Sequence, residues 1–513
     1  MLVAQMIVRN EGSKPYLKQC LDSLATYVDR IIVLDDASDD GITVDLCKSY
    51  SKVILYERAT SLFTINESSL RNELWGYTRN FINRYGDGEN KDWVISIDAD
   101  EVFNKDFTDT IRNLIVSDYD VITVKLCDMW NENEYRIDGW WSPLITRVFK
   151  YKDLPFRRGG NLHCGCIPAY VSESKKVLVR ADIRLKHLSY ISNIDKDRKY
   201  DFYVSRTRGF NLQHALTIKS KPTLKKFNDT FEYPTVLVGM LVRDRGWCLD
   251  KVLAGLNGQA YDRSKLKFLF LVNDSKDDSI DKIKKFKTDN EDLNIIIEEL
   301  NFGCANKDHT FPDEVLQNLT IMRNHVLEVG KAEDYVFLVD SDLVCENGQT
   351  LRHLVSMDKD IVSEVFWATW GQKEGRALPN VWQSGGYEIS EGYLQRLKVP
   401  GIYECGGLGA FTVISKKATL AGVNYSRVTN LPSTMRGEDR DYMIRANVLG
   451  FKLFADTYFT PKHLEKHLDC PDLIKQEEVK EKPTEEIKPI LPEIIKVNKM
   501  PISASLIVKD EGA

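Results

Sequence analysis

Two pairs of aspartates, each pair separated by one residue, are the feature of this sequence best suited to chemistry. Asp98 and Asp100 end the apolar run VISIDAD, and Asp340 and Asp342 end the run VFLVDSD. Alternate residues of an extended chain point to the same side, so both carboxylates of a pair can approach one centre. Carboxylate oxygens suit Mg²⁺ or Mn²⁺. Each pair therefore predicts a divalent-metal site at a strand end, where the ion would neutralise charge on a departing nucleoside diphosphate.

The landmarks around these aspartates occur twice in the same order. The matched segments are MIVRNEG (6–12) with MLVRDRG (240–246), LDDASDD (34–40) with VNDSKDD (272–278), and RLKHLSY (184–190) with TPKHLEK (460–466). The offset grows from 234 residues at the first landmark to 276 at the histidines. Self-similarity over this length predicts two tandem domains, with an insertion in the second.

The first landmark occurs a third time near the end of the sequence, as LIVKDEG at 506–512. We therefore expect a first domain at 1–225 with a C-terminal helical segment, and a second domain at 230–470. Residues 471–500, rich in Lys, Glu and Pro, are predicted to form a charged linker; a surface helix is the alternative. Residues 501–513 are predicted to be the first strand of a truncated third copy, which implies a further C-terminal domain in the full-length protein.

The elements that must position the aspartates alternate between strands and helices. The apolar runs expected to form strands are 2–8, 30–35 and 93–97 in the first copy, and 236–242, 267–272 and 335–339 in the second. Apolar residues at helical spacing follow the first run of each copy. The order strand–helix–strand predicts the α/β class, with a mostly parallel sheet covered by helices on both faces. Ligands of such sheets bind at the carboxyl ends of the strands, where the aspartates lie.

Composition excludes several classes of protein. The 513 residues are 43% hydrophobic and 28% charged, with a formal net charge of −6, which is typical of a globular chain and argues against a nucleic-acid partner. No stretch approaches the length of apolar residues that a transmembrane helix needs. The ten cysteines form neither a disulfide framework nor a zinc-ligand spacing. We expect reduced thiols in a cytoplasmic protein.

Taken together, MIVRNEG, VLDDASDDG and DADE resemble family 2 glycosyltransferases of the GT-A fold. The resemblance covers about residues 1–190, and a more distant GT-A likeness covers about 234–465. It implies two tandem GT-A domains, each with a Rossmann-like, mixed and mostly parallel sheet. It also implies a UDP-sugar as donor substrate and Mn²⁺ or Mg²⁺ as cofactor.

The resemblance also assigns residues to the nucleotide. Asp36 would pair with the nucleotide base, with Asp274 in that place in the second copy. Arg79 lies 19 residues before Asp98, and Arg323 lies 17 before Asp340, so each arginine would reach the nucleotide or its phosphates. Arg71 competes with Arg79 for this role.

The resemblance assigns the metal ligands and the remaining acids as follows. Asp100 and Asp342 would bind the metal directly, and His187 and His463 would complete its coordination. Asp98 and Asp340 would contact the ribose or a metal-bound water.

An inverting transfer needs a base that takes the proton of the acceptor hydroxyl. In the second copy, Asp439 with Glu438 precedes an amphipathic helix in RGEDRDYMIRANVLGF and is the predicted base; a helix-capping role is the alternative. Asp439 lies 24 residues before its histidine, and the same count in the first copy reaches His163. Either His163 acts there, or an acid such as Asp138 does, or the first copy is not a simple inverting enzyme.

Two further segments could contact sugar. MWNENEYRIDGWW at 129–141 mixes aromatic and polar residues that could stack on sugar rings, although its paired tryptophans could equally belong to the core. CGGLGAF at 405–411 offers glycine backbone for close approach to a ligand, with a plain turn as the alternative.

The sequence thus predicts a bifunctional glycosyltransferase of the hexosyl, inverting type. Each domain would transfer a sugar from a UDP-sugar to a glycan or glycoprotein acceptor. The alternative is one active domain beside a degenerate scaffold or carbohydrate-binding domain. A nucleotidyltransferase is disfavoured because RNEGSKPY is a poor match to a glycine-rich basic loop, and the phosphate-binding motif G-x-x-x-x-G-K-[ST] is absent.

Overall fold

The apolar runs form the centres of two sheets of eight strands each, one in each copy. The computed structural model describes residues 1–465 apart from Thr64 and the segments 139–142, 160–163, 206–209, 304–312, 370–375, 384–387 and 432–435. The described residues belong to one compact unit, Met1–Glu465. The predicted linker (471–500) and the predicted third start (501–513) lie outside the described residues.

The first domain begins with strand β1 and runs to β10. Its elements are β1 (Leu2–Val8), α1 (Pro15–Tyr27), β2 (Arg30–Asp35), α2 (Thr43–Lys48), β3 (Val53–Glu57), α3 (Glu67–Tyr85), β4 (Trp93–Ser96), β5 (Glu101–Phe103), α4 (Lys105–Leu114), β6 (Val121–Asp128), β7 (Glu134–Arg136), β8 (Leu144–Lys150), α5 (Ala169–Ser172), β9 (Val177–His187), α6 (Asn193–Ser205), α7 (Phe210–Lys219) and β10 (Leu224–Lys226). The sheet order is β3-β2-β1-β4-β8-β6-β9-β5.

The second domain begins at β11 and ends at β24. Its elements are β11 (Val236–Val242), α8 (Leu249–Asn257), a 3₁₀ turn (Arg263–Lys265), β12 (Leu266–Asn273), α9 (Ser279–Asp289), β13 (Asn294–Leu300), α10 (Asp313–Gly330), β14 (Tyr335–Leu338), β15 (Leu343–Val344), α11 (Thr350–Ser356), β16 (Ile361–Glu364), β17 (Trp367–Ala368), β18 (Leu378–Pro379), β19 (Val381–Trp382), α12 (Glu391–Leu397), β20 (Ile402–Cys405), β21 (Gly407–Leu408), β22 (Thr412–Ser415), α13 (Lys416–Leu420), α14 (Glu438–Val448), β23 (Leu453–Asp456) and β24 (Lys462–His463). The sheet order is β13-β12-β11-β14-β22-β16-β23-β20.

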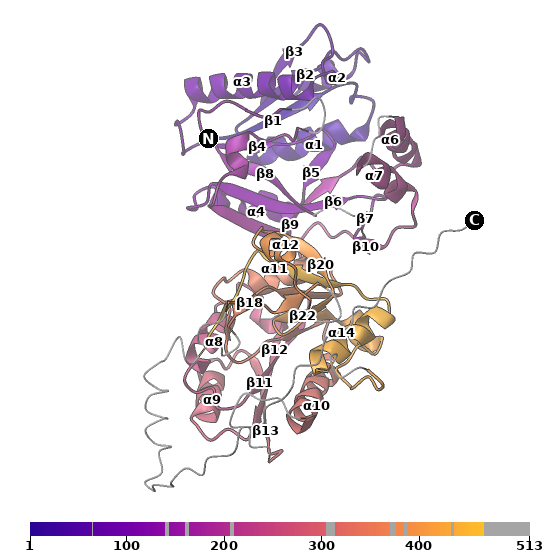
Figure 1. Cartoon of the computed structure of the whole chain (residues 1–513). Helices are drawn as coiled ribbons and strands as arrows, with labels where there is room; N and C mark the ends of the chain where they lie inside the picture. The colour runs from indigo at the N-terminus through magenta and orange to yellow at the C-terminus, as the bar shows by residue number, and fades with distance from the viewer. Residues whose placement is uncertain are drawn as a thin grey trace, which may run out of the picture. The chain divides into compact units, whose positions relative to one another are not determined.

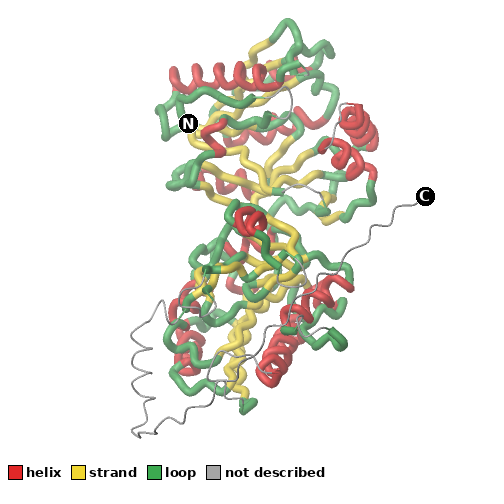
Figure 2. The backbone as a smooth tube through the Cα atoms, in the orientation of Figure 1, coloured by secondary structure: helices red, strands yellow, loops and turns green. Residues whose placement is uncertain are grey.

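The two sheets share the same arrangement of parallel and antiparallel neighbours. In each, the first four strands are parallel, the next two pairings are antiparallel, and the seventh strand is again parallel to its inner neighbour. The acids of both D-x-D pairs follow the strand beside the central one, β4 in the first domain and β14 in the second. The predicted α/β class with mixed, mostly parallel sheets is confirmed for both copies (Figure 2).

Helices cover both faces of each sheet, because each strand buries apolar side chains on both sides. In the first domain, residues of α1 and α4 pack on one face and residues of α3 on the other. In the second, α8, α9 and α11 pack on one face and α10, α13 and α14 on the other; Figure 1 shows α8 and α9 on the opposite side of the sheet from α10 and α14. The buried clusters of each domain consist of that domain's own residues, so each copy has its own core.

Within the compact unit, a buried group of charges joins residues of the two domains. Asp358, which follows α11, accepts a hydrogen bond from Lys225 at 2.6 Å and contacts Lys125 and Tyr135. Lys125 also donates to the backbone carbonyl of Ser356 at 2.6 Å. The Lys125 side chain is 3% exposed, so its ammonium depends on these partners.

Candidate active site

The predicted metal-binding acid and histidine of the first domain lie together. Nε2 of His187 is 3.4 Å from Oδ2 of Asp100. Pairing of β5 with β9 brings them together, because it sets Glu101, the next residue after Asp100, opposite His187. The backbone N–H of Leu188 also donates to the carbonyl of Asp100 at 2.8 Å. Register and backbone bonding thus position this pair.

The second domain repeats this geometry. Nε2 of His463 lies 3.8 Å from Oδ1 of Asp342, and pairing of β15 with β24 sets Leu343 opposite His463. The backbone N–H of Leu464 donates to the carbonyl of Asp342 at 2.9 Å. Each predicted acid therefore lies next to its predicted histidine, and the same strand pairing and the same backbone hydrogen bond position them in both copies.

The first acids of the two pairs have different surroundings. In the first domain, Arg71 donates to Oδ1 of Asp98 at 3.0 Å, and Arg147 lies 3.6 Å from Oδ2. Burial favours the protonated form of Asp98, but Arg71 and Arg147 hold the pKa of this carboxyl below its usual range. In the second domain, Arg323 is 3.8 Å from Asp340, whose side chain is 46% exposed. Asp98 is thus paired with two arginines, whereas Asp340 has one arginine at a longer distance; both side chains are partly exposed, at 38% and 46%.

Of the two arginines considered for the first copy, the structure brings Arg71 and not Arg79 to the acid pair. Arg79 donates to Asp153 at 2.8 Å on the outer part of α3. Arg71 lies two helical turns earlier on α3 and also bonds Glu67 at 3.2 Å. In the second copy the predicted residue, Arg323, does reach its acid.

Lys199 of α6 adds a positive charge beside the first-domain histidine. Its ammonium is 3.3 Å from Nε2 of His187 and contacts Ser189. Nδ1 of His187 is 2.6 Å from Asp128. Burial and Lys199 would lower the pKa of His187, but Asp100 and Asp128 outweigh them and raise it to about 9. In this arrangement the ammonium of Lys199 lies against the nitrogen that would bind a metal.

In the second domain the positive charge near the metal-binding acid comes from another element. Arg245, three residues after β11, donates to Oδ2 of Asp342 at 3.2 Å. The residue at this position in the first landmark is Glu11, whose pKa is raised mainly by burial, with Asp100 adding to the effect. Arg245 binds Oδ2 of Asp342, and the other oxygen, Oδ1, is the one that faces Nε2 of His463. The contact between the acid and the histidine is therefore kept.

The predicted base-binding aspartates contact loops in the structure. Asp36 is buried, and its two oxygens accept hydrogen bonds from Ser61, Leu62 and Phe63 at 2.6 to 3.0 Å. Asp274 accepts from the backbone N–H groups of 302 and 303, both at 3.1 Å.

The pairing of the strands shows that Asp36 and Asp274 do not occupy equivalent positions; they differ by one residue. Val8 pairs with Asp35 and Val242 with Val272, so the position after each strand pair is Asp36 in the first copy and Asn273 in the second. Asn273 also accepts from the loop, at 3.3 Å from the N–H of residue 302. The second copy thus has an amide where the first has a carboxylate, with Asp274 one residue further along.

The predicted base of the second copy lies close to the acid pair. Asp439 and Glu438 are in the first turn of α14, and Nη1 of Arg323 contacts both carboxylates, Glu438 at 3.2 Å. Burial raises the pKa of Asp439, and Arg323 only partly opposes this. The pKa of Glu438 is raised for the same reason. Arg323 therefore lies between Asp439 and Asp340, and burial makes Asp439 a stronger base than an exposed aspartate.

The glycine segment at 405–411 passes beside Asp439. A Cβ built on Gly409 would lie 3.6 Å from Oδ2 of Asp439. A Cβ on Gly407 would come within 2.2 Å of the Trp382 ring, so packing against this indole explains the glycine there.

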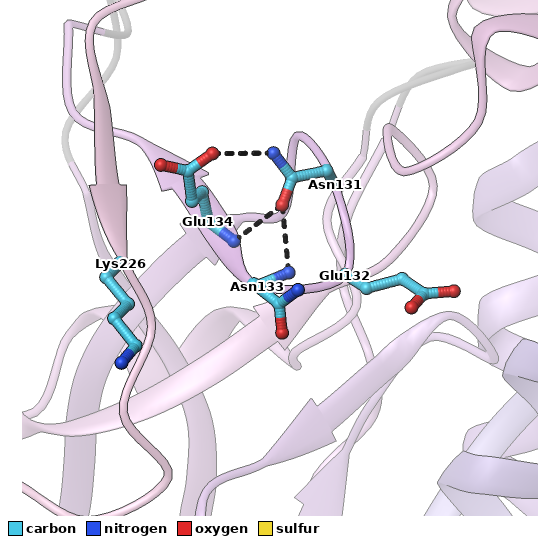
Figure 3. A pocket seen from close by; sticks show the side chains of 5 residues that line it. All are labelled: Asn131, Glu132, Asn133, Glu134 and Lys226. Atoms are coloured by element: carbon cyan, nitrogen blue, oxygen red, sulfur yellow. Dashed lines mark hydrogen bonds between the residues drawn. The ribbon is translucent and has the colours of Figure 1, made fainter.

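The aromatic–polar segment of the first copy (129–141) contains a turn at 131–134 that is held by its own hydrogen bonds. The side chain of Asn131 donates to Glu134 at 2.8 Å and accepts from the backbone of Asn133 and Glu134, both at 2.9 Å. These residues line a surface depression with Lys226, as Figure 3 shows. Trp130 stacks on Tyr190 with 5.5 Å between ring centroids, so this aromatic ring is engaged within the protein.

Some predicted residues lie outside the described residues: His163 and the tryptophans at 140 and 141. Asp138, the other acid considered for the first copy, is paired with Arg136 at 2.6 Å. The sequence did not identify Arg147, Lys199 or Arg245, which contact the predicted sites from other elements. Arg245 lies within the first landmark, MLVRDRG (240–246), where the first copy has Glu11.

In comparison with known proteins, the two copies match the models of different glycosyltransferase families. Residues 5–173 match the profile of glycosyl transferase family 2, and residues 233–443 match that of the glycosyltransferase family 25 N-terminal domain. The predicted likeness to family 2 is confirmed for the first copy. For the second copy, where a more distant GT-A likeness was expected, the matching model is that of family 25. No comparison supports a third copy.

The curated relatives are glycosyltransferase 25 family members from fruit flies. The protein of Drosophila melanogaster is 25% identical over 214 residues, and that of Drosophila pseudoobscura pseudoobscura is 28% identical over 221. Each alignment covers 40% of this chain and 33% of the relative, so the chain spans about a third of their length.

Two solved glycosyltransferase structures align with about half of this chain, with low sequence identity and low TM-scores. The mannosyltransferase PcManGT from Pyrobaculum calidifontis, in complex with GDP-Man and Mn²⁺, is 14% identical with a TM-score of 0.32, covering 48% of this chain and 61% of that one. S. aureus TarS 1–349 in complex with UDP-GlcNAc is 14% identical with a TM-score of 0.30, covering 46% and 61%.

Among the described residues, none of the helices combines the length and the apolar character needed to cross a membrane.

Proposed function

We propose that this chain is a bifunctional, nucleotide-sugar-dependent glycosyltransferase. Each domain transfers a sugar from a UDP-sugar to a glycan or glycoprotein acceptor. The observation that carries the proposal is the repeated acid–histidine pair, Asp100 with His187 and Asp342 with His463, held by the same register and backbone bond in both copies. The matches to two glycosyltransferase families support it.

The donor set of the second domain fits a divalent ion. Asp342 and His463 supply a carboxylate oxygen and an imidazole nitrogen, a combination that suits Mn²⁺, and Asp340 would contact the ribose or a metal-bound water beside them. When bound there, the ion would neutralise charge on the leaving diphosphate. Asp340 is the most open of the three, at 46% exposed, which suits contact with the donor.

The chain's own residues supply the proton transfer in this domain. Asp439 accepts the proton of the acceptor hydroxyl through its free oxygen, while Arg323 orients the carboxylate through the other. Burial raises the pKa of Asp439, which makes it a stronger base than an exposed aspartate. Glu438, on the same arginine, helps to position it.

One observation favours the alternative, in which the first domain is a degenerate donor-binding or scaffold domain. Both oxygens of Asp98 face arginines, and Lys199 lies against the nitrogen of His187. Lys199 must move before His187 can bind a metal, and the two arginines compete with a ribose or a metal-bound water for Asp98, so the first domain fits an ion less well than the second.

Nucleotide binding by matched variants tests the proposal. Calorimetry with UDP should show two sites that EDTA weakens, and Asp342→Ala should abolish the site of the second domain while Asp100→Ala abolishes the other. A chain in which Asp100→Ala changes nothing supports the degenerate first domain. UDP binding indifferent to EDTA and to both substitutions would contradict the proposal, and a panel of UDP- and GDP-sugars would then identify another donor.

A further inference from the structure

A second group of potential metal ligands lies in the interior of the second domain. His353 of α11, Glu364 at the end of β16 and Asp456 at the end of β23 each offer a ligand atom, and these atoms lie within 4.8 Å of one another. The three side chains are at most 2% exposed. This group contains none of the residues assigned to the nucleotide site.

Few polar groups satisfy these side chains. Nε2 of His353 lies 2.7 Å from Oδ2 of Asp456, whose other oxygen accepts from the N–H of Tyr458 at 2.9 Å. Glu364 accepts from the N–H of Phe459 at 3.2 Å, and its carboxyl lies close enough to Asp456 to share a hydrogen bond when one of the two acids is protonated. Oε1 of Glu364 and Nδ1 of His353 are buried without a hydrogen-bond partner in the described structure. Buried polar atoms in proteins are nearly always bonded, so the unbonded Oε1 of Glu364, which belongs to this group, indicates that a ligand completes the site.

The charges of the group also lack a counter-ion. Two carboxylates are buried together, and no lysine or arginine in the described chain forms an ion pair with either; His353 is the only basic partner. Two ionised carboxylates, a neutral imidazole and a divalent cation would together be neutral, which removes the cost of burying the acids.

The first domain shows that the fold itself does not need these residues. In the second domain Glu364 pairs with Asp456 across β16 and β23. At the matching place across β6 and β9, Val124 pairs with Arg180. The buried acids are therefore specific to the second domain.

We propose that His353, Glu364 and Asp456 bind a divalent transition-metal ion, with Zn²⁺ as the best fit, inside the second domain. One imidazole and two carboxylates are a ligand set that Zn²⁺ accepts. The ion joins α11, β16 and β23. It also fixes the chain that leaves β23 toward His463, seven residues after Asp456. Its role is to stabilise the strand end that delivers the candidate active-site histidine.

The test measures metal in a chain whose nucleotide sites are disabled. The parent for every measurement is the full chain with Asp100→Ala and Asp342→Ala. After dialysis against Zn²⁺ and removal of excess metal, elemental analysis should find one equivalent of Zn²⁺ per chain. Glu364→Gln, which keeps the shape but not the charge, should weaken Zn²⁺ binding by at least about 100-fold, more than the loss of an outer partner costs. Glu404→Gln, an exposed residue of β20 paired with Lys452, is the matched control and should bind Zn²⁺ as the parent does.

Co²⁺ substitution provides a readout in the same parent, since its visible absorption reports ligand geometry. A spectrum that Glu364→Gln and His353→Ala both abolish supports the site. If these variants do not fold, the parent decides: a retained equivalent of Zn²⁺ whose removal by chelator lowers the Tm supports the proposal. No retained metal in the parent, or undiminished binding by folded Glu364→Gln and His353→Ala, overturns it and leaves a protonated Glu364 sharing its proton with Asp456.

Discussion

Substitution of Asp439 by asparagine separates a catalytic role from a structural one. The residue lies in the first turn of α14, where any acid gains from the helix dipole. That contribution is worth about 0.3 to 1 kcal/mol. A general base instead contributes about 10²- to 10⁴-fold in rate, which is about 2.7 to 5.4 kcal/mol in the barrier. Loss of a catalytic base would therefore slow the reaction by at least about 10²-fold, whereas loss of a helix-terminal acid would mainly lower stability by about 1 kcal/mol or less.

Asp441→Asn is the matched control for this experiment. Asp441 belongs to the same helical turn and is buried, but it accepts from the N–H of Val428 at 2.9 Å and lies outside the group around Arg323. Both substitutions remove one acid from the same helix end. In a chain carrying Asp100→Ala, which isolates the second domain, we expect Asp439→Asn to lower the transfer rate by about 10²- to 10⁴-fold, and Asp441→Asn to change it only slightly.

The assay is release of nucleoside diphosphate from the donor in the presence of acceptor, with calorimetry of UDP binding beside it. UDP affinity should stay the same in Asp439→Asn, since the base contacts the acceptor. Near-normal transfer by Asp439→Asn, or equal losses in the two variants, would refute the reasoning and leave Asp439 as a helix-terminal acid.

The remaining predictions concern charge and pH. Replacing Arg323 by methionine removes the largest influence that lowers the pKa of Asp439, so the acid side of the pH–rate profile should move to higher pH. His187 has a raised pKa of about 9 in the fold against about 6.5 when unfolded; its stabilisation is complete below pH 6.5 and lost toward pH 9, so the Tm of metal-free protein should fall over this window, and less so in His187→Gln. Asp358→Asn leaves Lys125 buried without its carboxylate and should lower the free energy of unfolding by about 3 to 5 kcal/mol, measured by urea denaturation. Separate expression of 1–225 and 235–470 should give two cooperative melts, since each has its own core; an insoluble half would contradict this.

The sheets and the acid–histidine pairs were predictable from sequence for a physical reason. Buried parallel strands appear as short apolar runs, and the chain leaves them where ligands bind. The residues flanking these runs could therefore be assigned, as with Asp342 and His463. The exact equivalence of Asp36 was not predictable, because matching letters aligned it with Asp274, whereas hydrogen-bonded register places Asn273 there.

The surrounding cations were not predictable, because they come from elements far along the chain. Arg147 of β8 and Lys199 of α6 meet the first acid pair only through the pairing of strands and the packing of a helix. The buried group in the second domain has the same origin: His353, Glu364 and Asp456 come from three elements. The spacing of residues along the sequence does not indicate which side chains the pairing of strands and the packing of helices bring together.

The positions of these cations argue for unequal roles of the two domains. Each copy holds one positive group beside its second acid, but at different atoms. Lys199 lies 3.3 Å from the histidine nitrogen itself, so an ion must displace it. Arg245 binds the far oxygen of Asp342, and the near oxygen still faces His463 at 3.8 Å. At the position of Arg245 the first copy has Glu11, a further acid near Asp100, and Lys199 is the cation that acts on Asp100 instead. A divalent ion therefore competes with a resident ammonium in the first domain and completes an existing pair in the second, so metal affinity should be higher in the second domain.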